Sequence, residues 1–88
     1  MRFKEKIVFI TGGLSGIGLS AAKDFMSEGA YVILNSRTKA KFEILKPTLK
    51  SISNSFEFIE GDMSKKEDVD KTFEYIKDKF GKIDIVVN

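Results

Sequence analysis

The sequence contains no cysteine and no histidine. It therefore cannot form disulfides, and it offers no thiolate nucleophile, no imidazole base and none of the usual ligand sets for zinc. An excess of one charge is also lacking, because 15 basic residues are balanced by 13 acidic ones to give a formal net charge of +2. This mild balance and the scattered lysines argue against nucleic acid or an anionic membrane as a partner. Any chemistry must use other groups, and we expect no metal site.

Long hydrophobic runs are missing as well. The opening stretch "MRFKEKIVFI" places basic residues before apolar ones, but the apolar run covers only residues 7–10 before the glycines follow. That is too short for a signal peptide or a membrane span. We therefore expect a cytoplasmic protein, and the 88 residues leave room for one small domain that spans 1–88.

Short apolar runs alternate with longer amphipathic stretches along the whole chain. The apolar runs cover residues 7–10, 32–34, 56–59 and 83–87. This alternation predicts β-α-β-α units, and continuous apolar runs are typical of parallel strands that are covered on both faces. With right-handed crossovers, the sequence predicts an α/β fold in which helices lie on both sides of a doubly wound parallel sheet.

Apolar residues at helical spacing predict the helices between these strands. The first set ends near Gly29, which can adopt a left-handed cap conformation. Its members are Ile17, Ala21, Ala22, Phe25 and Met26. The middle helix is expected over about residues 38–45, because Pro47 should end or kink it.

The last helix has the clearest pattern. Ser64 and Glu67 match the S-x-x-E capping box at its start, and Gly81 follows its end. The apolar stripe between them consists of Val69, Phe73, Ile76 and Phe80.

A glycine-rich stretch, "IVFITGGLSGIGLSAAKDF" at residues 7–25, joins the first strand to the first helix. The first N–H groups of a helix have no partner within it and carry the positive end of the helix dipole, so they favour phosphate. In a diphosphate site, Gly12 would permit the tight turn, Gly16 the close approach and Gly18 the packing of helix against strand. The alternative is that the glycines only mark a turn. A Walker loop is excluded because no Gly-Lys-Ser/Thr follows.

The stretch "TGGLSGIG" at residues 11–18 resembles the glycine motif of the short-chain dehydrogenase/reductase family. Three further segments resemble the family in the same order, namely "NSR" at 35–37, "GDMS" at 61–64 and "DIVVN" at 84–88. The resemblance covers essentially the whole chain. It implies a Rossmann-type sheet with strand order 3-2-1-4, here partial and truncated after the fourth strand, and a nicotinamide dinucleotide as cofactor.

The resemblance also implies which residues contact this cofactor. Ser15 and the backbone of Ile17 would contact its phosphates. Asp62 and the backbone of Met63 would flank the adenine, while Asn88 would lie near the ribose toward the nicotinamide. For Asp62 the alternative is an ordinary carboxylate in a turn or at a helix start.

Ser36 and Arg37 bear on the choice between NAD(H) and NADP(H). Where NAD-binding members of the family carry an acid that accepts the ribose hydroxyl bonds, this sequence has Ser36, and Arg37 follows it. An acid would repel a 2′-phosphate, whereas a guanidinium can bind it in a bidentate fork. We therefore predict a preference for NADP(H), with NAD(H) as the second cofactor. The alternative is that Arg37 is a solvated arginine at a strand end.

The catalytic groups of the resembled family are not found within residues 1–88. The resemblance implies hydride transfer between the nicotinamide and a carbonyl or alcohol, with a serine, a tyrosine and a lysine that belong to elements after the fourth strand. The segment "YIKDK" at 75–79 matches Tyr-x-x-x-Lys, but it lies in the helix before that strand. We interpret it as a solvated helix face. We therefore assign no catalytic residue and expect these 88 residues alone to be inactive.

Three interpretations remain open. The first is the cofactor-binding half of a longer, homo-oligomeric reductase of small carbonyl compounds or alcohols, similar to 3-oxoacyl-[acyl-carrier-protein] reductase or to a sugar or alcohol dehydrogenase. The second is a non-catalytic dinucleotide-binding module, or a remnant of one. The third is a module that self-associates through the fourth strand, whose unpaired backbone groups invite pairing with another chain.

Overall fold

The computed structural model describes residues 2–12 and 14–88. Within them, helices and strands alternate along the chain as the apolar pattern predicts. The elements are β1 (Ile7–Thr11), α1 (Gly16–Ser27), β2 (Tyr31–Ser36), α2 (Ala40–Ile52), β3 (Phe56–Glu60), α3 (Lys66–Phe80) and β4 (Ile85–Val87). No helix in this described part combines the length and the apolar character that crossing a bilayer requires.

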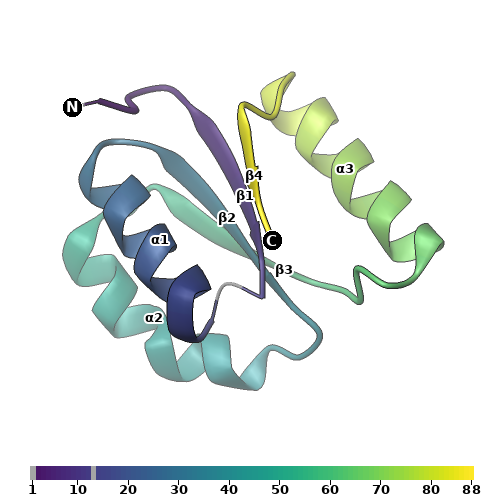
Figure 1. Cartoon of the computed structure of the whole chain (residues 1–88), viewed down its shortest axis with the longest axis horizontal. Coiled ribbons are helices and arrows are strands. Elements are labelled where there is room, and N and C mark those ends of the chain that lie inside the picture. The colour runs from purple at the N-terminus through teal and green to yellow at the C-terminus, as the bar shows by residue number, and fades with distance from the viewer. Residues whose placement is uncertain (1, 13) are drawn as a thin grey trace.

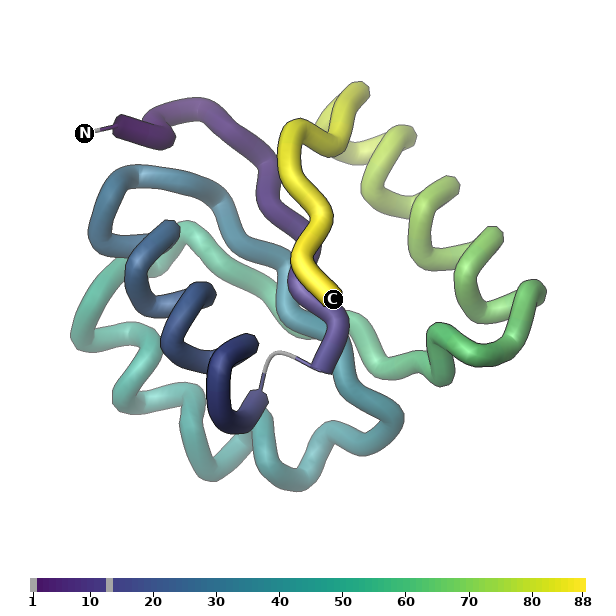
Figure 2. The backbone as a smooth tube through the Cα atoms, viewed as in Figure 1, coloured from purple at the N-terminus to yellow at the C-terminus, as the bar shows by residue number. Residues whose placement is uncertain are grey.

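The strands form one parallel sheet in the order β3-β2-β1-β4. This result confirms the α/β, Rossmann-type fold and the predicted strand order 3-2-1-4. Phe9 of β1 is paired with Ile33 of β2 on one side and with Val86 of β4 on the other. Because the strands are parallel, their carboxyl ends lie at one edge of the sheet, and the loops after β1, β2 and β3 leave from that edge (Figure 2).

Helices cover both faces of the sheet, with α1 and α2 on one side and α3 on the other (Figure 1). Side chains of β1 alternate between the two sides. Val8 and Ile10 pack in the cluster that contains residues of α1 and α2, whereas Ile7 and Phe9 pack in the cluster that contains Ile76 of α3. All of these residues are buried, which confirms that the continuous apolar run is a strand covered on both faces. Each buried side chain of this size contributes about 1.5–3 kcal/mol to stability.

The apolar face of α1 begins one turn later than the spacing predicts. Ala22 and Met26 are buried, and Phe25 packs against the same cluster. Ile17 shares the helical spacing of these residues but is 87% exposed, so it does not belong to the buried face. The reason is its position in the first turn, which follows the glycine-rich loop at the rim of the sheet (Figure 1). Gly29 closes the helix in the predicted left-handed conformation, with φ of +92°.

α2 begins at Ala40 and continues to Ile52, so the prediction that it covers residues 38–45 and ends near Pro47 is wrong. A proline in a helix interior removes one backbone hydrogen bond and crowds the preceding turn. Packing on both sides of Pro47 offsets this cost, because Phe42 and Leu49 are both buried in the cluster against the sheet. Tertiary contacts thus override the local preference.

α3 begins without the predicted capping box between Ser64 and Glu67. Its N-cap residue is Lys65, and no side chain makes a cap hydrogen bond. Ser64 instead forms hydrogen bonds with Asp62: it donates to Asp62 Oδ1 from its Oγ at 2.6 Å and from its N–H at 2.9 Å. At the other end, Gly81 adopts the predicted left-handed conformation, with φ of +76°. Of the predicted stripe, the second core cluster contains or contacts Phe73, Ile76 and Phe80.

Candidate functional site

The loops after β1, β2 and β3 line an open hollow of about 430 Å³ at the carboxyl edge of the sheet. Its lining consists of Thr11, Gly12, Asn35, Ser36, Arg37, Gly61, Asp62, Met63 and Ser64. The hollow therefore brings together half of the residues that the sequence assigns to the cofactor, although they come from three separate loops. The other assigned residues lie at the start of α1 and at the end of β4.

Gly12 and Gly16 both have left-handed backbone conformations, with φ of +63° and +55°. A residue that carries a Cβ is strained there by roughly 1–2 kcal/mol. A Cβ built at either glycine meets no atom within 4 Å, so the space beside them is open. The backbone conformation alone thus requires glycine, and the open space additionally admits a ligand. Gly13, the remaining glycine before Leu14, lies outside the described residues.

The first backbone N–H groups of α1 have no partner within the helix, and the space beside Gly16 is open. Ser15 is the N-cap residue, with an extended φ of −154°, and its side chain makes no cap hydrogen bond. Ile17 is exposed and Gly18 half-buried, and the first turn contains no acidic residue. The positive end of the helix dipole is therefore not neutralised by a carboxylate of the same turn. Such a helix start fits an anionic group such as a phosphate.

Asn35 holds the ends of β2 and β3 together. It is buried, with 3% exposure, and its Nδ2 donates to the carbonyl oxygens of Ile59 at 3.0 Å and Gly61 at 3.2 Å. Its own carbonyl oxygen accepts a bond from the N–H of Gly12 at 3.1 Å. One side chain and one carbonyl thus fix three loops of the hollow. In the sequence, Asn35 stands out only as part of "NSR", and this role was not predicted, although a polar residue at the end of an apolar strand could have indicated it.

Ser36 and Arg37 form the part of the hollow that follows β2. Ser36 is half-buried at the end of the strand, and its carbonyl oxygen accepts a bond from Gly61 N–H at 3.0 Å. Its Oγ accepts a longer bond of 3.5 Å from the N–H of Thr38. Arg37 is exposed, so its guanidinium is accessible to a ligand in the hollow. No acidic side chain stands at these two positions.

Asp62 is held in one orientation by its neighbours. The hydrogen bonds from the hydroxyl and the backbone N–H of Ser64 lower the pKa of Asp62 below its ordinary value, and the positive charge of Arg37 contributes in the same direction. Its backbone N–H donates to Asp68 Oδ2 at 2.8 Å. Asp68 thereby anchors the loop that also carries Met63. Asp68 does not stand out in the sequence, because an acidic residue in a first helical turn is common.

Asn88 lies beside the end of β1 (Figure 2). The hydroxyl of Thr11 donates to Asn88 Oδ1 at 3.2 Å and makes a longer contact of 3.5 Å with the carbonyl oxygen of Val87. Thr11 also lines the hollow. The last residue of the chain is thus linked to the site through one side chain that sequence reasoning names only as part of the glycine motif.

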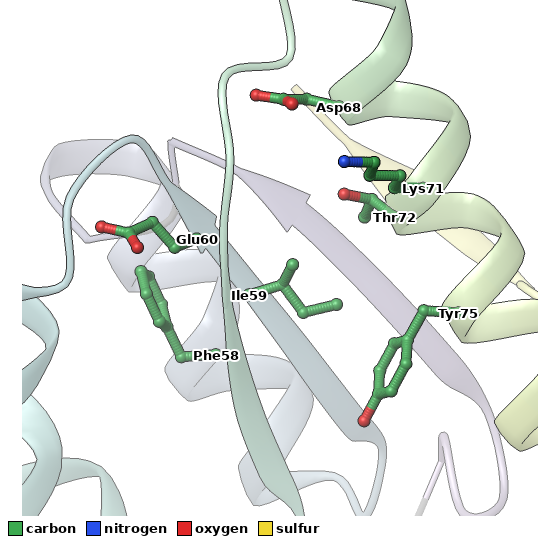
Figure 3. Close-up of a pocket in the computed structure, with 7 residues that line it drawn as sticks. All are labelled: Phe58, Ile59, Glu60, Asp68, Lys71, Thr72 and Tyr75. Carbon is green, nitrogen blue, oxygen red and sulfur yellow. The ribbon is translucent and has the colours of Figure 1, made fainter.

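The Tyr75–Lys79 pair lies elsewhere. Tyr75 lines a separate hollow of about 270 Å³ between β3 and α3, together with Ile59 and Thr72 (Figure 3). None of the residues that line it comes from the loops after β1 and β2. Lys79 Nζ donates to Tyr75 Oη at 3.2 Å and to Glu57 Oε2 at 2.8 Å. The bond to Glu57 is the larger of these two causes that raise the pKa of Lys79.

Comparison with known proteins shows which family the chain belongs to. The family model described as short chain dehydrogenase matches residues 6–88. The chain therefore belongs to the short-chain dehydrogenase family. A 3beta-hydroxysteroid dehydrogenase of Mediterraneibacter gnavus is 36% identical over 87 residues, which cover 99% of this chain and 32% of that protein. An uncharacterized oxidoreductase of Bacillus subtilis, YvrD, is 41% identical over 91 residues, which cover 100% of this chain and 33% of that protein.

Solved structures agree with the fold. The crystal structure of a 3-ketoacyl-(acyl-carrier-protein) reductase from Brucella melitensis, complexed with NADH, has a TM-score of 0.81 and 36% identity. That match covers 96% of this chain and 33% of the other. The chain thus spans about a third of the length of the relatives that it matches.

Proposed function

We propose that residues 1–88 are the amino-terminal, NADP(H)-binding part of an oxidoreductase that transfers hydride between the nicotinamide and a small carbonyl compound or alcohol. The observation that carries this proposal is the hollow in which Ser36 and Arg37 lie beside the loop of Gly12. Family membership supports the oxidoreductase class. The open space beside the glycines and the acid-free first turn of α1 support a bound diphosphate.

The backbone of the glycine-rich loop would hold the diphosphate. The helix start supplies the N–H groups of Gly16, Ile17 and Gly18, which have no partner within α1. Ser15 would add its hydroxyl, because that group makes no cap hydrogen bond in the described part of the chain. Gly12 would keep the turn tight enough for the phosphate to reach these donors.

The remaining cofactor contacts would come from the other loops. Asp62 and the backbone of Met63 line the hollow where the adenine would lie. Ionised Asp62 accepts hydrogen bonds only, so it would accept one from an amino group of the base. Asn88 would contact the ribose next to the nicotinamide, supported by its bond with Thr11.

Arg37 is the residue that would select NADP(H) over NAD(H). A guanidinium offers two parallel N–H groups to a phosphate, and Ser36 adds a hydroxyl without a negative charge. The Brucella melitensis reductase was solved with NADH, so a preference for the phosphorylated cofactor would be a property of the residues at these two positions.

The reaction would need groups that we do not assign within this chain. When bound, the cofactor supplies or accepts a hydride, and in the family a tyrosine, a lysine and a serine handle the proton and orient the substrate oxygen. We therefore expect residues 1–88 alone to bind the cofactor without turnover. The proposal also includes a substrate such as a 3-oxoacyl thioester, a homo-oligomeric state and a cytoplasmic location. The second candidate, a binding module without catalysis, rests on the same hollow.

Titration with NADPH and NADH, followed by nucleotide fluorescence or calorimetry, tests the proposal. We expect saturable binding of both, with NADPH tighter. Equal affinities would contradict the role of Arg37, and no binding would contradict the cofactor site. An intact-mass spectrum of the natural protein then separates the two candidates. A mass near that of about 250 residues, the size of a larger single α/β domain, supports the enzyme, whereas 9.9 kDa supports the binding module.

A further inference from the structure

β3 forms one edge of the sheet in the described part of the chain, with β2 as its neighbour. Val32 N–H donates to the carbonyl oxygen of Ser55, and Gly61 N–H donates to that of Ser36. Partners alternate along a parallel ladder, so every second residue of β3 bonds to β2. The N–H and C=O groups that point away from the sheet are those of Phe56, Phe58 and Glu60.

This edge carries few of the features that protect an edge strand from pairing. Its sequence is "FEFIE", with no proline, glycine or lysine. Natural edges are blunted by charged side chains, above all lysine, and by proline, bulges or very short strands; of these features β3 has only its two glutamates. β3 instead presents five residues of regular, β-prone backbone. An additional strand could therefore continue the sheet here.

The hollow on the α3 side of this edge is the one lined by Ile59, Thr72 and Tyr75 (Figure 3). Figure 3 shows Ile59 directed toward α3, whereas Phe58 and Glu60 are directed to the opposite face. Tyr75 is 43% exposed. A side chain of an added strand would cover it.

A second hollow, of about 330 Å³, lies on the α2 side of the same edge. Phe42 stacks on Phe58 at a centroid distance of 4.7 Å and contacts Phe56 edge-on at 6.2 Å. Side chains of an added strand alternate between the two faces. They would enter the α3-side hollow and the α2-side hollow in turn, which is the arrangement by which strand addition gains specificity.

The α2-side hollow carries unbalanced positive charge. Its rim contains Lys39, Glu43, Lys46 and Lys50, at helical spacing along α2. Lys39 pairs with Glu43 at 3.6 Å, and Glu57 is bound by a lysine of α3. Lys46 and Lys50 take part in none of the ion pairs of the described chain. An added strand should place a carboxylate there.

We propose that β3 is a self-association edge at which the β3 of a second copy of this chain pairs antiparallel, around a two-fold axis at Phe58. In this register Glu60 of the second copy lies opposite Phe56, on the α2 side and at the end of the hollow near Asn54. Its carboxylate then meets Lys46 and Lys50, and the two-fold axis repeats the contact. The outward peptide groups of both strands satisfy one another, and the sheet continues through both copies.

Sedimentation velocity over a wide concentration range tests the pairing with the natural protein. Glu60→Lys turns both symmetric attractions into repulsions, so we expect the dimer dissociation constant to rise at least about tenfold. Adding Lys46→Glu and Lys50→Glu to Glu60→Lys should restore the dimer. Glu74→Lys is the matched control, because it makes the same charge change at an exposed α3 position that lines neither hollow.

Glu60→Pro provides a second variant. The N–H of Glu60 points away from β2, so proline there removes a donor of the proposed contact while leaving the internal ladder intact. Circular dichroism confirms that each variant is folded. In the wild type, amide exchange at Phe58 and Glu60 should slow as concentration rises, whatever the variants do. A monomer at all concentrations, or variants that associate as tightly as the wild type through another edge such as β4, would overturn the proposal.

Discussion

The backbone N–H of Ile7 donates to Asp84 Oδ2 at 2.8 Å, and the N–H of Asp84 donates to the carbonyl oxygen of Ile7 at 2.9 Å. This reciprocal pair joins the first residue of β1 to the residue just before β4, across 77 positions of the chain. It helps to set the register between β1 and β4, the pair at this edge of the sheet in the described part of the chain. Lys82 adds an ion pair to the same carboxylate at 3.2 Å.

The Asp84 carboxylate should make stability depend on acid pH. The bond from Ile7 N–H, followed by Lys82, lowers the pKa of Asp84 below its ordinary value. A carboxyl whose pKa is lower in the folded state stabilises the fold fully above its unfolded pKa of about 3.9, and this contribution is lost as the pH falls through the folded value. We therefore expect the free energy of unfolding to fall below about pH 4.

Asp84→Asn should flatten this acid dependence and lower the stability at neutral pH, as measured by urea unfolding at pH 7 and pH 3. Asparagine keeps an acceptor oxygen but loses the charge. Asp78→Asn, at an exposed position of α3, is the matched control. An unchanged pH dependence in Asp84→Asn would show that other carboxylates are responsible.

The fold could be predicted from the sequence because its two main signals are local and strong. Continuous apolar runs such as Ile7–Ile10 occur where strands are buried on both faces, and Gly29 and Gly81 mark helix ends by a conformation that few other residues adopt. The failures have a different origin. Whether α2 crosses Pro47 depends on how Phe42 and Leu49 pack against strands far away in sequence, which no local preference records.

The candidate site could be predicted only in part for the same reason. The glycine motif, Arg37 and Asp62 stand out by residue type and order. Asn35 is recognisable only once β2 and β3 lie side by side, since its bonds reach 24 and 26 positions along the chain. The predicted capping box does not form because Ser64 bonds to Asp62, two positions before it. The spacing of a motif does not indicate which of two nearby carboxylates a serine will bind.

Gly12→Ala should destabilise the protein even without cofactor. The residue has φ of +63° and an added Cβ meets no atom, so the expected loss of about 1–2 kcal/mol comes from backbone strain alone. Urea unfolding measures it. Gly61→Ala is the control, because Gly61 has no positive φ. Its added Cβ would have the flexible end of Met63 as its nearest neighbour, at 3.4 Å, and two further atoms at 3.8 Å, which is ordinary contact. Equal losses in both variants would contradict the strain argument.

Arg37→Asp should reverse the order of cofactor affinities. It removes the cation proposed to bind the 2′-phosphate and introduces an acceptor for the ribose hydroxyls, so NADPH should weaken by about tenfold or more while NADH tightens. Calorimetric titration of both cofactors measures the switch. Arg2→Asp makes the same charge change before β1, at the opposite end of the strands, and should leave the order intact. If both variants weaken NADPH equally, overall charge rather than a local contact decides the preference.

Under the proposed function, Tyr75→Phe should leave the cofactor binding and the turnover of the full-length protein unchanged. Tyr75 lies between β3 and α3, and Lys79 keeps its bond to Glu57 without the tyrosine hydroxyl. Steady-state kinetics with NADPH and a reducible carbonyl compound provide the measurement. Lys79→Met is the informative companion, because it would leave Glu57 without its cation, and Oε1 of Glu57 is already buried without a partner. We expect this variant to unfold at lower urea. Lost turnover in a folded Tyr75→Phe protein would make Tyr75 catalytic.

Pro47→Ala should stabilise the protein. Alanine restores the N–H that Pro47 lacks, at a position where α2 is continuous from Ala40 to Ile52, and the side chain is exposed, so no packing is lost. Proline in a helix interior is less favourable than alanine by about 3 kcal/mol, but it also restricts the unfolded chain, so we expect a net gain of ~1–2 kcal/mol. Thr48→Ala, at the next exposed position, should gain only about 0.5 kcal/mol. If Pro47→Ala leaves the free energy of unfolding unchanged, the proline must fit into α2 at no cost. The packing of Phe42 and Leu49, rather than the unbroken backbone hydrogen bonds of the helix, would then determine the course of α2.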